Sequence, residues 1–533
     1  MQTPEDQPAA EEILIAGAWR PATATSTFQA VNPSTGIPLP ASFPISAWPD
    51  CDHALDAAVA AARGLRTASG AEIAAFLDAY AAAIESAAEE LVATAHQETG
   101  LAIKPRLLDV ELPRTTTQLR QAASAARDGS WQHAVIDTKN NIRSHFAPIG
   151  PVVVFGPNNF PFAFNGISGG DFAAAIATGC PVIAKAHPLH PGTTRLLAQC
   201  AASALAQSTL PPATVQMLYS VANEDALRLV GDPRIGASSF TGSRAGGLRL
   251  KAAADAAGKP MYLEMSSLNP IVILPGAIAE RGGTLPTELA DSCLAASGQF
   301  CTSPNLILAI AGEPARQLQA AFGELLASRP SAPLLSEGGL AALNNTVHSL
   351  IDAGATLVTG GSPIEGEAFR YKNTLLATSG EQFLAESHRL QQEAFGNSTL
   401  FITAADLPQL VQVLESLEGN LTGSIYSIST GADDHLYDTV APALRSRVGR
   451  LLNDKMPTGV ALSPAMNHGG PFPSTSHPGF TAVGIPRSLL RFGALHCYDN
   501  VREDRLPAAL RLDRGTAPAW RVVDGRWLNN SPA

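Results

Sequence analysis

Cysteine is scarce in this sequence of 533 residues, and the cysteines present show no spacing that indicates a metal site. No CxxC pair occurs, so nothing in the pattern predicts a bound metal. Cysteines scattered through a long chain favour a reducing compartment over a secreted, disulfide-stabilised protein. The six are Cys51, Cys180, Cys200, Cys293, Cys301 and Cys497.

Long apolar runs are also missing. No run is long enough to cross a bilayer without a glycine, a proline or a charged residue. Residues 1–6 (MQTPED) are polar and acidic and lack the basic and apolar regions of a signal peptide. We therefore expect a cytoplasmic protein with no membrane partner.

Positive charge is in short supply. Lysine and arginine number 36 against 47 aspartates and glutamates, a net charge of −11. This balance argues against nucleic acid or an anionic membrane as the main partner. A small nucleotide cofactor is not excluded, because local groups hold it. With 45% apolar and 16% charged residues the chain is of the globular class, and it is too long for a single core.

Strand-like and helix-like segments alternate over residues 150–258 and 267–460. Such alternation is typical of parallel, doubly wound sheets, so the predicted fold class is α/β. The Ala-rich stretch 50–127 has a helical period broken near Gly70 and Gly100, and three helices fit it.

Two further segments have a β pattern. Residues 131–147 alternate apolar and polar and predict a two-stranded ribbon. The pattern fits equally an arm that pairs with another subunit and an edge hairpin packed on its own domain. Residues 481–485 are also predicted to form a strand.

One cysteine is a plausible nucleophile. Cys301 follows Gly298-Gln299-Phe300, and a glycine three residues upstream leaves room for a substrate carbon to approach. A thiolate is a strong nucleophile at neutral pH. On this stretch alone, a small buried hydrophobic residue is the commoner interpretation.

Two polar residues near predicted strand ends are candidates for catalysis. Asn159 follows the strand that ends at Phe155, where an amide can donate to a developing oxyanion. A turn ended by Pro161 is the simpler interpretation. Glu264 ends a strand among apolar neighbours, where a carboxylate is suited to act as a general base. The alternative is a buried structural glutamate.

Other residues suit a nucleotide. Gly242, Ser243 and Gly247 lie where a strand leads into a helix, and amides at a helix start bind phosphate. A tight turn is the competing interpretation. Lys185 ends a strand, where a lysine holds ribose hydroxyls or phosphate or is simply solvated.

The segment Glu393-Ala394-Phe395 completes this group of cofactor candidates. The carboxylate of Glu393 suits a ribose diol, and the ring of Phe395 suits a nicotinamide. A surface glutamate beside a core phenylalanine is the alternative.

Taken together and in this order, the motifs resemble the aldehyde dehydrogenase superfamily over nearly the whole chain. Each motif is modest alone, whereas five in the same order are specific. The likeness starts at Asn32-Pro33-Ser34-Thr35-Gly36, and the five are Asn159-Phe160-Pro161, Phe240-Thr241-Gly242-Ser243, Glu264, Gly298-Gln299-x-Cys301 and Glu393-x-Phe395-Gly396.

A nearer likeness is to the α-ketoglutaric semialdehyde dehydrogenase branch. The segments that carry it are Gly169-Gly170-Asp171, Lys185-Ala186-His187-Pro188-Leu189-His190-Pro191-Gly192-Thr193, Ser267-Leu268-Asn269-Pro270, His468-Gly469-Gly470-Pro471-Phe472-Pro473 and Trp520-Arg521-Val522-Val523-Asp524-Gly525.

The resemblance implies a Rossmann-type cofactor domain at 1–130 and 148–266. It implies a catalytic α/β domain at 267–477, and a small β oligomerisation arm with a C-terminal tail at 131–147 and 478–533. A homodimer or homotetramer follows from the same likeness.

The resemblance also implies catalytic roles. Cys301 attacks the aldehyde carbon, Asn159 and the Cys301 amide stabilise the oxyanion, and Glu264 activates the water that hydrolyses the thioester.

The cofactor roles follow in the same way. NAD or NADP takes the hydride; Lys185 and Glu393 hold its riboses, Phe395 positions the nicotinamide, and Ser243 with the turn after it faces the pyrophosphate.

The sequence departs from the family pattern at four positions. Ser266 and Ser267 stand where two glycines are usual and crowd the backbone near the nicotinamide, and Asn397 replaces a proline. Pro188 replaces the glutamate that many NAD-using relatives carry, which removes repulsion towards a 2′-phosphate. The choice between NAD and NADP stays open.

An aldehyde that carries a carboxylate needs a cation at the far end of its tunnel. By resemblance Arg114 lies on the helix at the tunnel mouth, and we predict that it binds this carboxylate. A surface arginine is the alternative. Phe162 and His468 are further candidates for the pocket wall.

The favoured reaction is oxidation of 2,5-dioxopentanoate to 2-oxoglutarate. The nearest alternative is a dehydrogenase of broader preference for aliphatic, fatty aldehydes. A third alternative is a catalytically weakened homologue that acts as a binding protein. It is considered because Ser266 and Ser267 replace two usual glycines.

Overall fold

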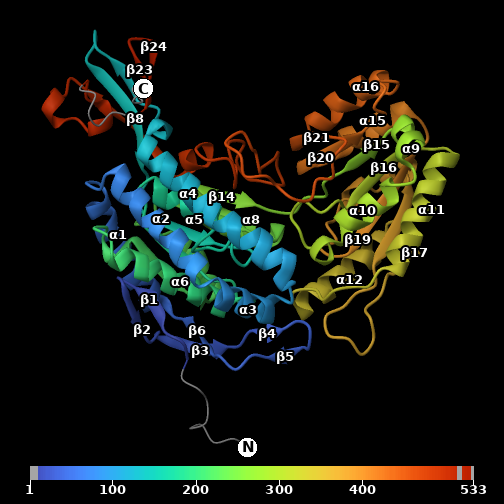
Figure 1. Cartoon of the computed structure of the whole chain (residues 1–533), viewed down its shortest axis with the longest axis horizontal. Helices are drawn as coiled ribbons and strands as arrows, with labels where there is room; N and C mark the ends of the chain where they lie inside the picture. The colour runs from blue at the N-terminus through green and yellow to red at the C-terminus, as the bar shows by residue number, and fades with distance from the viewer. Residues whose placement is uncertain (1–9, 513–518, 530–533) are drawn as a thin grey trace, which may run out of the picture.

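The computed structural model describes residues 10–512 and 519–529, so residues 1–6 considered above lie outside the described part. Two large sheets form two lobes, and a β ribbon projects from the first lobe (Figure 1). In the described part of the chain, no helix is long and apolar enough to cross a membrane.

The first sheet is built around the fully buried strand β9 (Val152–Phe155). A strand buried on both faces reads as continuous apolar sequence, as Val152 to Phe155 does. Within the described residues the strand order is β14-β13-β9-β10-β11-β1-β2, and the five strands β14, β13, β9, β10 and β11 run parallel. The other strands are β1 (Ile13–Ile15), β2 (Ala18–Arg20), β10 (Val182–Lys185), β11 (Val215–Leu218), β13 (Ala237–Thr241) and β14 (Met261–Glu264).

Helices cover this sheet, and the stretch 50–127 differs from the prediction in their number. Four α-helices and one wide-turned helix occupy it in the described structure, because the chain breaks at Ala87 as well as near the two glycines. Glu72 and Ser69 form a reciprocal capping box at the start of α2. The helices are α1 (Trp48–Leu65), α2 (Gly70–Ser86), α3 (Ala88–Thr99), η2 (Ile103–Glu111), α4 (Leu112–Asp128), α5 (Gly170–Ala177), α6 (Pro191–Ala206), α7 (Asn223–Val230) and α8 (Arg244–Ala256).

The second sheet has the order β17-β18-β19-β16-β15-β20-β21 in the described chain, with only β17 antiparallel. Its strands are β15 (Ile271–Ile273), β16 (Leu306–Ile310), β17 (Thr356–Thr359), β18 (Thr374–Ser379), β19 (Ser398–Ala404), β20 (Asn420–Tyr426) and β21 (Val448–Asn453). Separate apolar clusters pack on its two faces under helices. These helices include α9 (Pro275–Arg281), α10 (Leu285–Leu294), α11 (Glu313–Ser328), α12 (Glu337–Asp352), α15 (Leu407–Ser416) and α16 (Asp434–Arg445). Both regions of alternating pattern therefore form the doubly wound α/β sheets that the sequence predicts.

The predicted ribbon is present as β7 (Val135–Asp137) and β8 (Ile142–Pro148). In the same chain it pairs with C-terminal strands in the order β22-β8-β7-β23-β24. These strands are β22 (Gly493–Asp499), β23 (Trp520–Val523) and β24 (Arg526–Asn529). The prediction of a strand at 481–485 is wrong, because that segment is a series of bends. The pairing of the C-terminal region with β8 begins at Gly493.

Candidate active site

Four neighbouring parallel strands deliver polar residues to one edge of the first sheet. Their order is β10-β9-β13-β14, and Lys185 and Glu264 are the last residues of the two outer strands. Asn159 follows β9, and Ser243 follows β13. In an open α/β sheet, ligands bind beyond the carboxyl ends of the strands, where the strand order reverses. Here β9 is the first of these parallel strands, with β10 on one side and β13 on the other, so the reversal lies at β9.

Cys301 lies on a tightly bent loop of the second lobe, between α10 and β16. Three successive residues before it, Ala296, Ser297 and Gly298, have positive φ. A side chain added at Gly298 would place its Cβ 2.1 Å from the carbonyl oxygen of Gly396. The glycine is thus needed for its φ of 70° and for backbone packing, which differs from the predicted role of leaving room for substrate.

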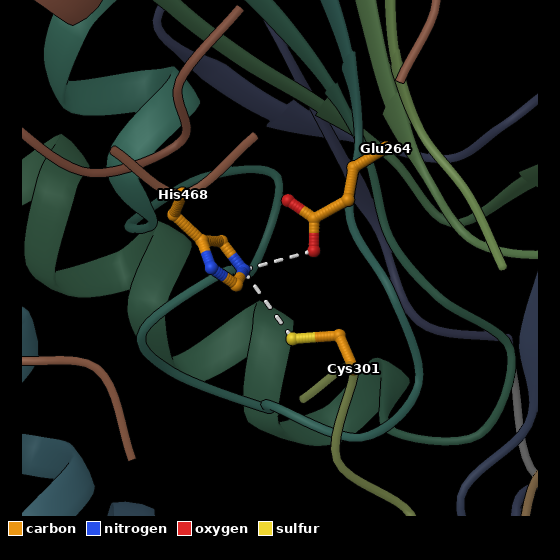
Figure 2. A group of neighbouring side chains, drawn as sticks. All are labelled: Glu264, Cys301 and His468. Atoms are coloured by element: carbon orange, nitrogen blue, oxygen red, sulfur yellow. Dashed lines mark hydrogen bonds and ion pairs between the residues drawn. The ribbon is translucent and has the colours of Figure 1, made fainter. Parts of the chain in front are cut away.

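The Cys301 thiol lies beside two buried side chains (Figure 2). Its Sγ is 3.3 Å from Nε2 of His468, and the same Nε2 is 3.0 Å from Oε1 of Glu264. The His468 and Glu264 side chains are each 1% exposed. The second carboxylate oxygen of Glu264, Oε2, is buried with no hydrogen-bond partner in the described structure. The site therefore combines a thiol, an imidazole and a carboxylate in one cluster.

The groups around the Cys301 thiol shift its pKa in opposite directions. Burial raises the pKa of the Cys301 thiol well above its usual value, and the negative charge of Glu264 raises it further. The guanidinium of Arg114 acts in the other direction. A group that takes up the thiol proton is therefore needed, and the imidazole of His468 is the nearest nitrogen that can do so.

Asn159 lies beside the same loop. Its amide nitrogen Nδ2 donates to the carbonyl oxygen of Gln299 at 2.8 Å, which fixes the side chain against the residues before Cys301. An amide nitrogen carries two hydrogens, so a second one stays available for an oxyanion. Asn159 lines the larger of the two cavities that meet at Cys301.

That larger cavity holds about 280 Å³ and is bounded by residues from several strand ends. Gly242 and Ser243 line it where β13 leads into α8, together with Glu393 and Phe395. Ser243 caps α8 by accepting from the amide of Gly246. A helix start, a carboxylate and an aromatic ring around one cavity suit a dinucleotide.

Two predicted cofactor residues lie elsewhere on this edge. Gly247 is one turn into α8, where its amide donates to the carbonyl oxygen of Ser243 at 2.9 Å. A side chain at Gly247 would meet Phe240 and Met265, so the glycine serves helix–strand packing. Lys185 ends β10, and burial lowers the pKa of its amine to about 8.

Ser266 and Ser267 act on Glu393. The amide of Ser267 donates to Oε1 of Glu393 at 3.3 Å, and the Ser266 hydroxyl also bonds this carboxylate. Burial raises the pKa of Glu393 to about 7, while these two hydrogen bonds lower it. The serines that replace the usual glycines therefore hold a cofactor candidate in place.

A second cavity of about 90 Å³ approaches Cys301 from the other side. Its wall is mainly aromatic, with Phe160, Phe164 and Phe300. Phe162 is fully buried in the core of the first lobe, so the prediction that it lines this pocket is wrong. The turn that holds residues 160–164 points the first and last rings at the pocket and the middle one inwards.

Arg114 lies in this second cavity on α4. One nitrogen donates to the carbonyl oxygen of Val460, and the guanidinium carbon lies 5.6 Å from the ring centroid of Phe164. Nε and Nη2 are buried without a hydrogen-bond partner in the described structure. A buried donor left unpaired is costly, which indicates an anionic ligand.

Sequence reasoning missed Arg106, another guanidinium in this cavity. It is paired with Glu111 and lies 4.4 Å from the ring centroid of Phe160. Its neutralised charge distinguishes it from Arg114. The signal available in the sequence was an arginine eight residues before Arg114, on the helix η2 that leads into α4.

A family model described as the aldehyde dehydrogenase family matches residues 19–450. The chain is 37% identical over 528 residues to alpha-ketoglutaric semialdehyde dehydrogenase 2 of Azospirillum brasilense, covering 97% of this chain and 99% of that protein. It is 33% identical to alpha-ketoglutaric semialdehyde dehydrogenase of Acinetobacter baylyi, covering 96% and 98%.

Solved structures share the fold. Lactaldehyde dehydrogenase from Escherichia coli superposes with a TM-score of 0.80 at 21% identity, covering 92% of this chain and 99% of that one. Aldehyde dehydrogenase C from Pseudomonas syringae, solved with NAD+ and octanal, gives a TM-score of 0.78 at 20% identity, covering 94% and 98%.

Proposed function

The chain belongs to the aldehyde dehydrogenase family, and we propose that it oxidises 2,5-dioxopentanoate to 2-oxoglutarate with NAD+ or NADP+. Arg114 is the observation that carries this choice of substrate. Its unpaired guanidinium nitrogens lie in the pocket that ends at Cys301, where they would meet the carboxylate of an acidic aldehyde. The two relatives named for this semialdehyde support it.

The first step forms a bond between Sγ of Cys301 and the aldehyde carbon. Nε2 of His468, 3.3 Å from Sγ, takes the thiol proton in the tautomer that carries its hydrogen on Nδ1, and the new N–H on Nε2 then donates to Glu264. The oxygen of the resulting thiohemiacetal accepts from the amide of Asn159 and from the backbone N–H of Cys301.

A nicotinamide held in the larger cavity would supply the acceptor for the hydride that leaves the thiohemiacetal carbon as the thioester forms. Glu264 then removes a proton from a water molecule that attacks the thioester carbon. Hydrolysis releases the acid and returns the thiol. The buried carboxylate of Glu264 lies beside both the imidazole and the cofactor cavity, which suits this role.

The cofactor would be held by the residues of the larger cavity. Ser243 and the turn at Gly242 would face the pyrophosphate, Glu393 would accept from a ribose, and Phe395 would back the nicotinamide. Lys185 would meet the second ribose. Pro188 offers no carboxylate against a 2′-phosphate, so both NAD+ and NADP+ are accepted in this proposal.

A specific observation favours a second candidate. The aromatic wall formed by Phe160, Phe164 and Phe300 also suits an aliphatic aldehyde. Steady-state kinetics with 2,5-dioxopentanoate and with hexanal decide between the two. A higher kcat/KM for 2,5-dioxopentanoate supports the proposal. A higher kcat/KM for hexanal would show that the enzyme prefers aliphatic aldehydes. Cys301→Ala is the blank in both assays.

The protein is proposed to be a homodimer or homotetramer. Strand β22 is an edge of the five-stranded sheet in the described chain, and its Leu495 is 65% exposed. An exposed edge strand is a ready surface for pairing. Light scattering at micromolar concentration tests this, and a monomer contradicts it.

A further inference from the structure

We propose that Cys301, His468 and Glu264 together bind a zinc ion, and that zinc held there blocks the thiol reversibly. Binding of the metal goes beyond the proposed oxidation. Only the inhibition rests on the proposed role of Cys301 as nucleophile. The sequence gives no sign of such a site, because the three ligands lie 37 and 167 residues apart, at positions 264, 301 and 468.

The three ligand atoms already lie close to the spacing that zinc requires. Zinc bonds of about 2.0–2.3 Å in a tetrahedron place neighbouring ligand atoms about 3.3–3.7 Å apart. Here Sγ of Cys301 is 3.3 Å from Nε2 of His468, and this nitrogen is 3.0 Å from Oε1 of Glu264. All three ligand atoms lie within 4.8 Å of one another. Small rotations of side chains would complete the geometry.

A second observation points to a ligand at this position. Oε2 of Glu264 is buried and has no hydrogen-bond partner in the described structure. The carboxylate is 1% exposed, so a partner for this oxygen has to come from within the cavity that Glu264 lines. A cation would satisfy this carboxylate without any new donor from the chain.

The local charges also admit a cation. The carboxylates of Glu264 and Glu393 line the same cavity as Cys301. Arg114 and Arg450 oppose a cation, and the carboxylates of Glu264 and Glu393 offset their two positive charges. A divalent ion between sulfur and carboxylate neutralises both and releases the thiol proton to solvent.

The donor set selects the metal. Sulfur and imidazole nitrogen suit zinc, whereas magnesium and calcium prefer oxygen ligands. Three protein ligands leave one position for water. Cys301 lines both cavities, so an ion has an entry path from either side.

Occupancy by zinc would stop the chemistry at its first step. The sulfur electron pair that attacks an aldehyde would be shared with the metal, and Nε2 of His468 would no longer accept the thiol proton. Removal of zinc by a chelator would restore both groups, because the only bond that breaks in the protein is S–H, and the thiolate regains its proton from water.

Cobalt(II) is the probe for the test, since it replaces zinc and its thiolate complexes absorb light. The purified full-length enzyme, freed of metal with EDTA, is titrated with Co²⁺. We expect one equivalent to give a thiolate-to-cobalt charge-transfer band, which Zn²⁺ then abolishes. Cys301→Ser should remove the band, whereas Cys497→Ser, at an exposed cysteine on β22, should leave it intact.

The other two ligands are tested by shape-conserving changes. His468→Gln and Glu264→Gln should each raise the dissociation constant for Zn²⁺ at least about 10-fold, because loss of an outer partner alone costs about 10–100-fold. The midpoint of thermal unfolding, measured by circular dichroism, serves as the folding control. Unchanged affinity in both variants means that zinc binds the thiol alone, and absence of the band in the wild type also overturns the proposal.

Inhibition is measured separately with 2,5-dioxopentanoate. Zn²⁺ should abolish turnover at one bound equivalent, and EDTA should restore it. A cobalt band in an enzyme that turns over no aldehyde would leave the metal site standing and remove the proposed function. Turnover that persists with the site filled would contradict the inhibition.

Discussion

Nε2 of His468 lies 3.0 Å from the carboxylate of Glu264, and this pairing fixes what the imidazole does at Cys301. Once Nε2 has taken the thiol proton, it becomes a donor whose partner is already in place. The resulting imidazolium is stabilised by the carboxylate in a buried setting, where charged hydrogen bonds are strong. The thiol thus has a proton acceptor although burial raises its pKa.

His468→Phe should slow the alkylation of Cys301 by iodoacetamide about 100-fold, the lower end of what a positioned proton acceptor contributes. The ring is kept, so the pocket wall formed with Phe164 should stay packed. The rate is followed by mass spectrometry of the Cys301 peptide. His468→Gln is the matched variant, and equal rates in both and in the wild type would remove His468 from thiol activation.

Arg114→Met should lower kcat/KM for 2,5-dioxopentanoate about 10- to 100-fold, since a hydrogen bond to a charged group contributes about 1.5–3 kcal/mol. The loss should appear mainly in KM, because the carboxylate lies away from the reacting carbon. Hexanal, which has no carboxylate, is the matched substrate and should be unaffected. An equal loss with both aldehydes would show that Arg114 acts on the pocket's shape.

The edge of the first sheet was predictable because each of its residues is fixed by a local pattern. Glu264 and Lys185 end apolar strands, and parallel strands bring their carboxyl ends to one edge. Ser243 follows a strand and begins a helix. No distant contact is needed for these assignments, so the sequence alone places them.

The pairing of His468 with Cys301 was not predictable from spacing, because a loop of the second lobe and a loop from the far C-terminal region bring them together. The prediction that Phe162 lines the pocket was wrong for a related reason. Residues 160–164 form turns instead of a regular element, and no period tells which ring points inwards. The segment 481–485 has β-like composition, yet no strand lies beside it in the described structure to pair with.

Cofactor affinity should fall as pH is lowered through about 7, because Glu393 then becomes protonated and loses acceptor capacity for a ribose. Ser266→Ala removes a hydrogen bond that lowers this pKa, so the midpoint should move to higher pH. The dissociation constant for NAD+ or NADP+ is measured by fluorescence from pH 5.5 to 8.5. Glu393→Gln should flatten the profile. A wild-type profile that is already flat would exclude Glu393 from cofactor binding.

Acid should destabilise the β ribbon through His145. Burial lowers the pKa of this imidazole from its ordinary 6.5 to about 4, and its ring packs beside His496 and Tyr498. A group that protonates more readily when unfolded contributes stability that is present above pH 6.5 and is lost as the pH falls towards 4. His145→Phe should therefore reduce the slope of Tm against pH in this window. The same slope in wild type and variant would contradict this.

Gly298→Ala should both destabilise the protein and displace Cys301. The new Cβ would lie 2.1 Å from the carbonyl oxygen of Gly396, and alanine is disfavoured at a φ of 70°. We expect a loss of about 1–3 kcal/mol, typical of a strained backbone position. Gly283→Ala is the matched control, because a Cβ there meets no atom within 4 Å. Unfolding in denaturant gives the stability, and alkylation of Cys301 reports its position. If Gly298→Ala leaves both unchanged, the loop can relax, and the close packing on Gly396 does not fix the nucleophile. If stability falls while alkylation stays normal, the glycine serves the fold alone.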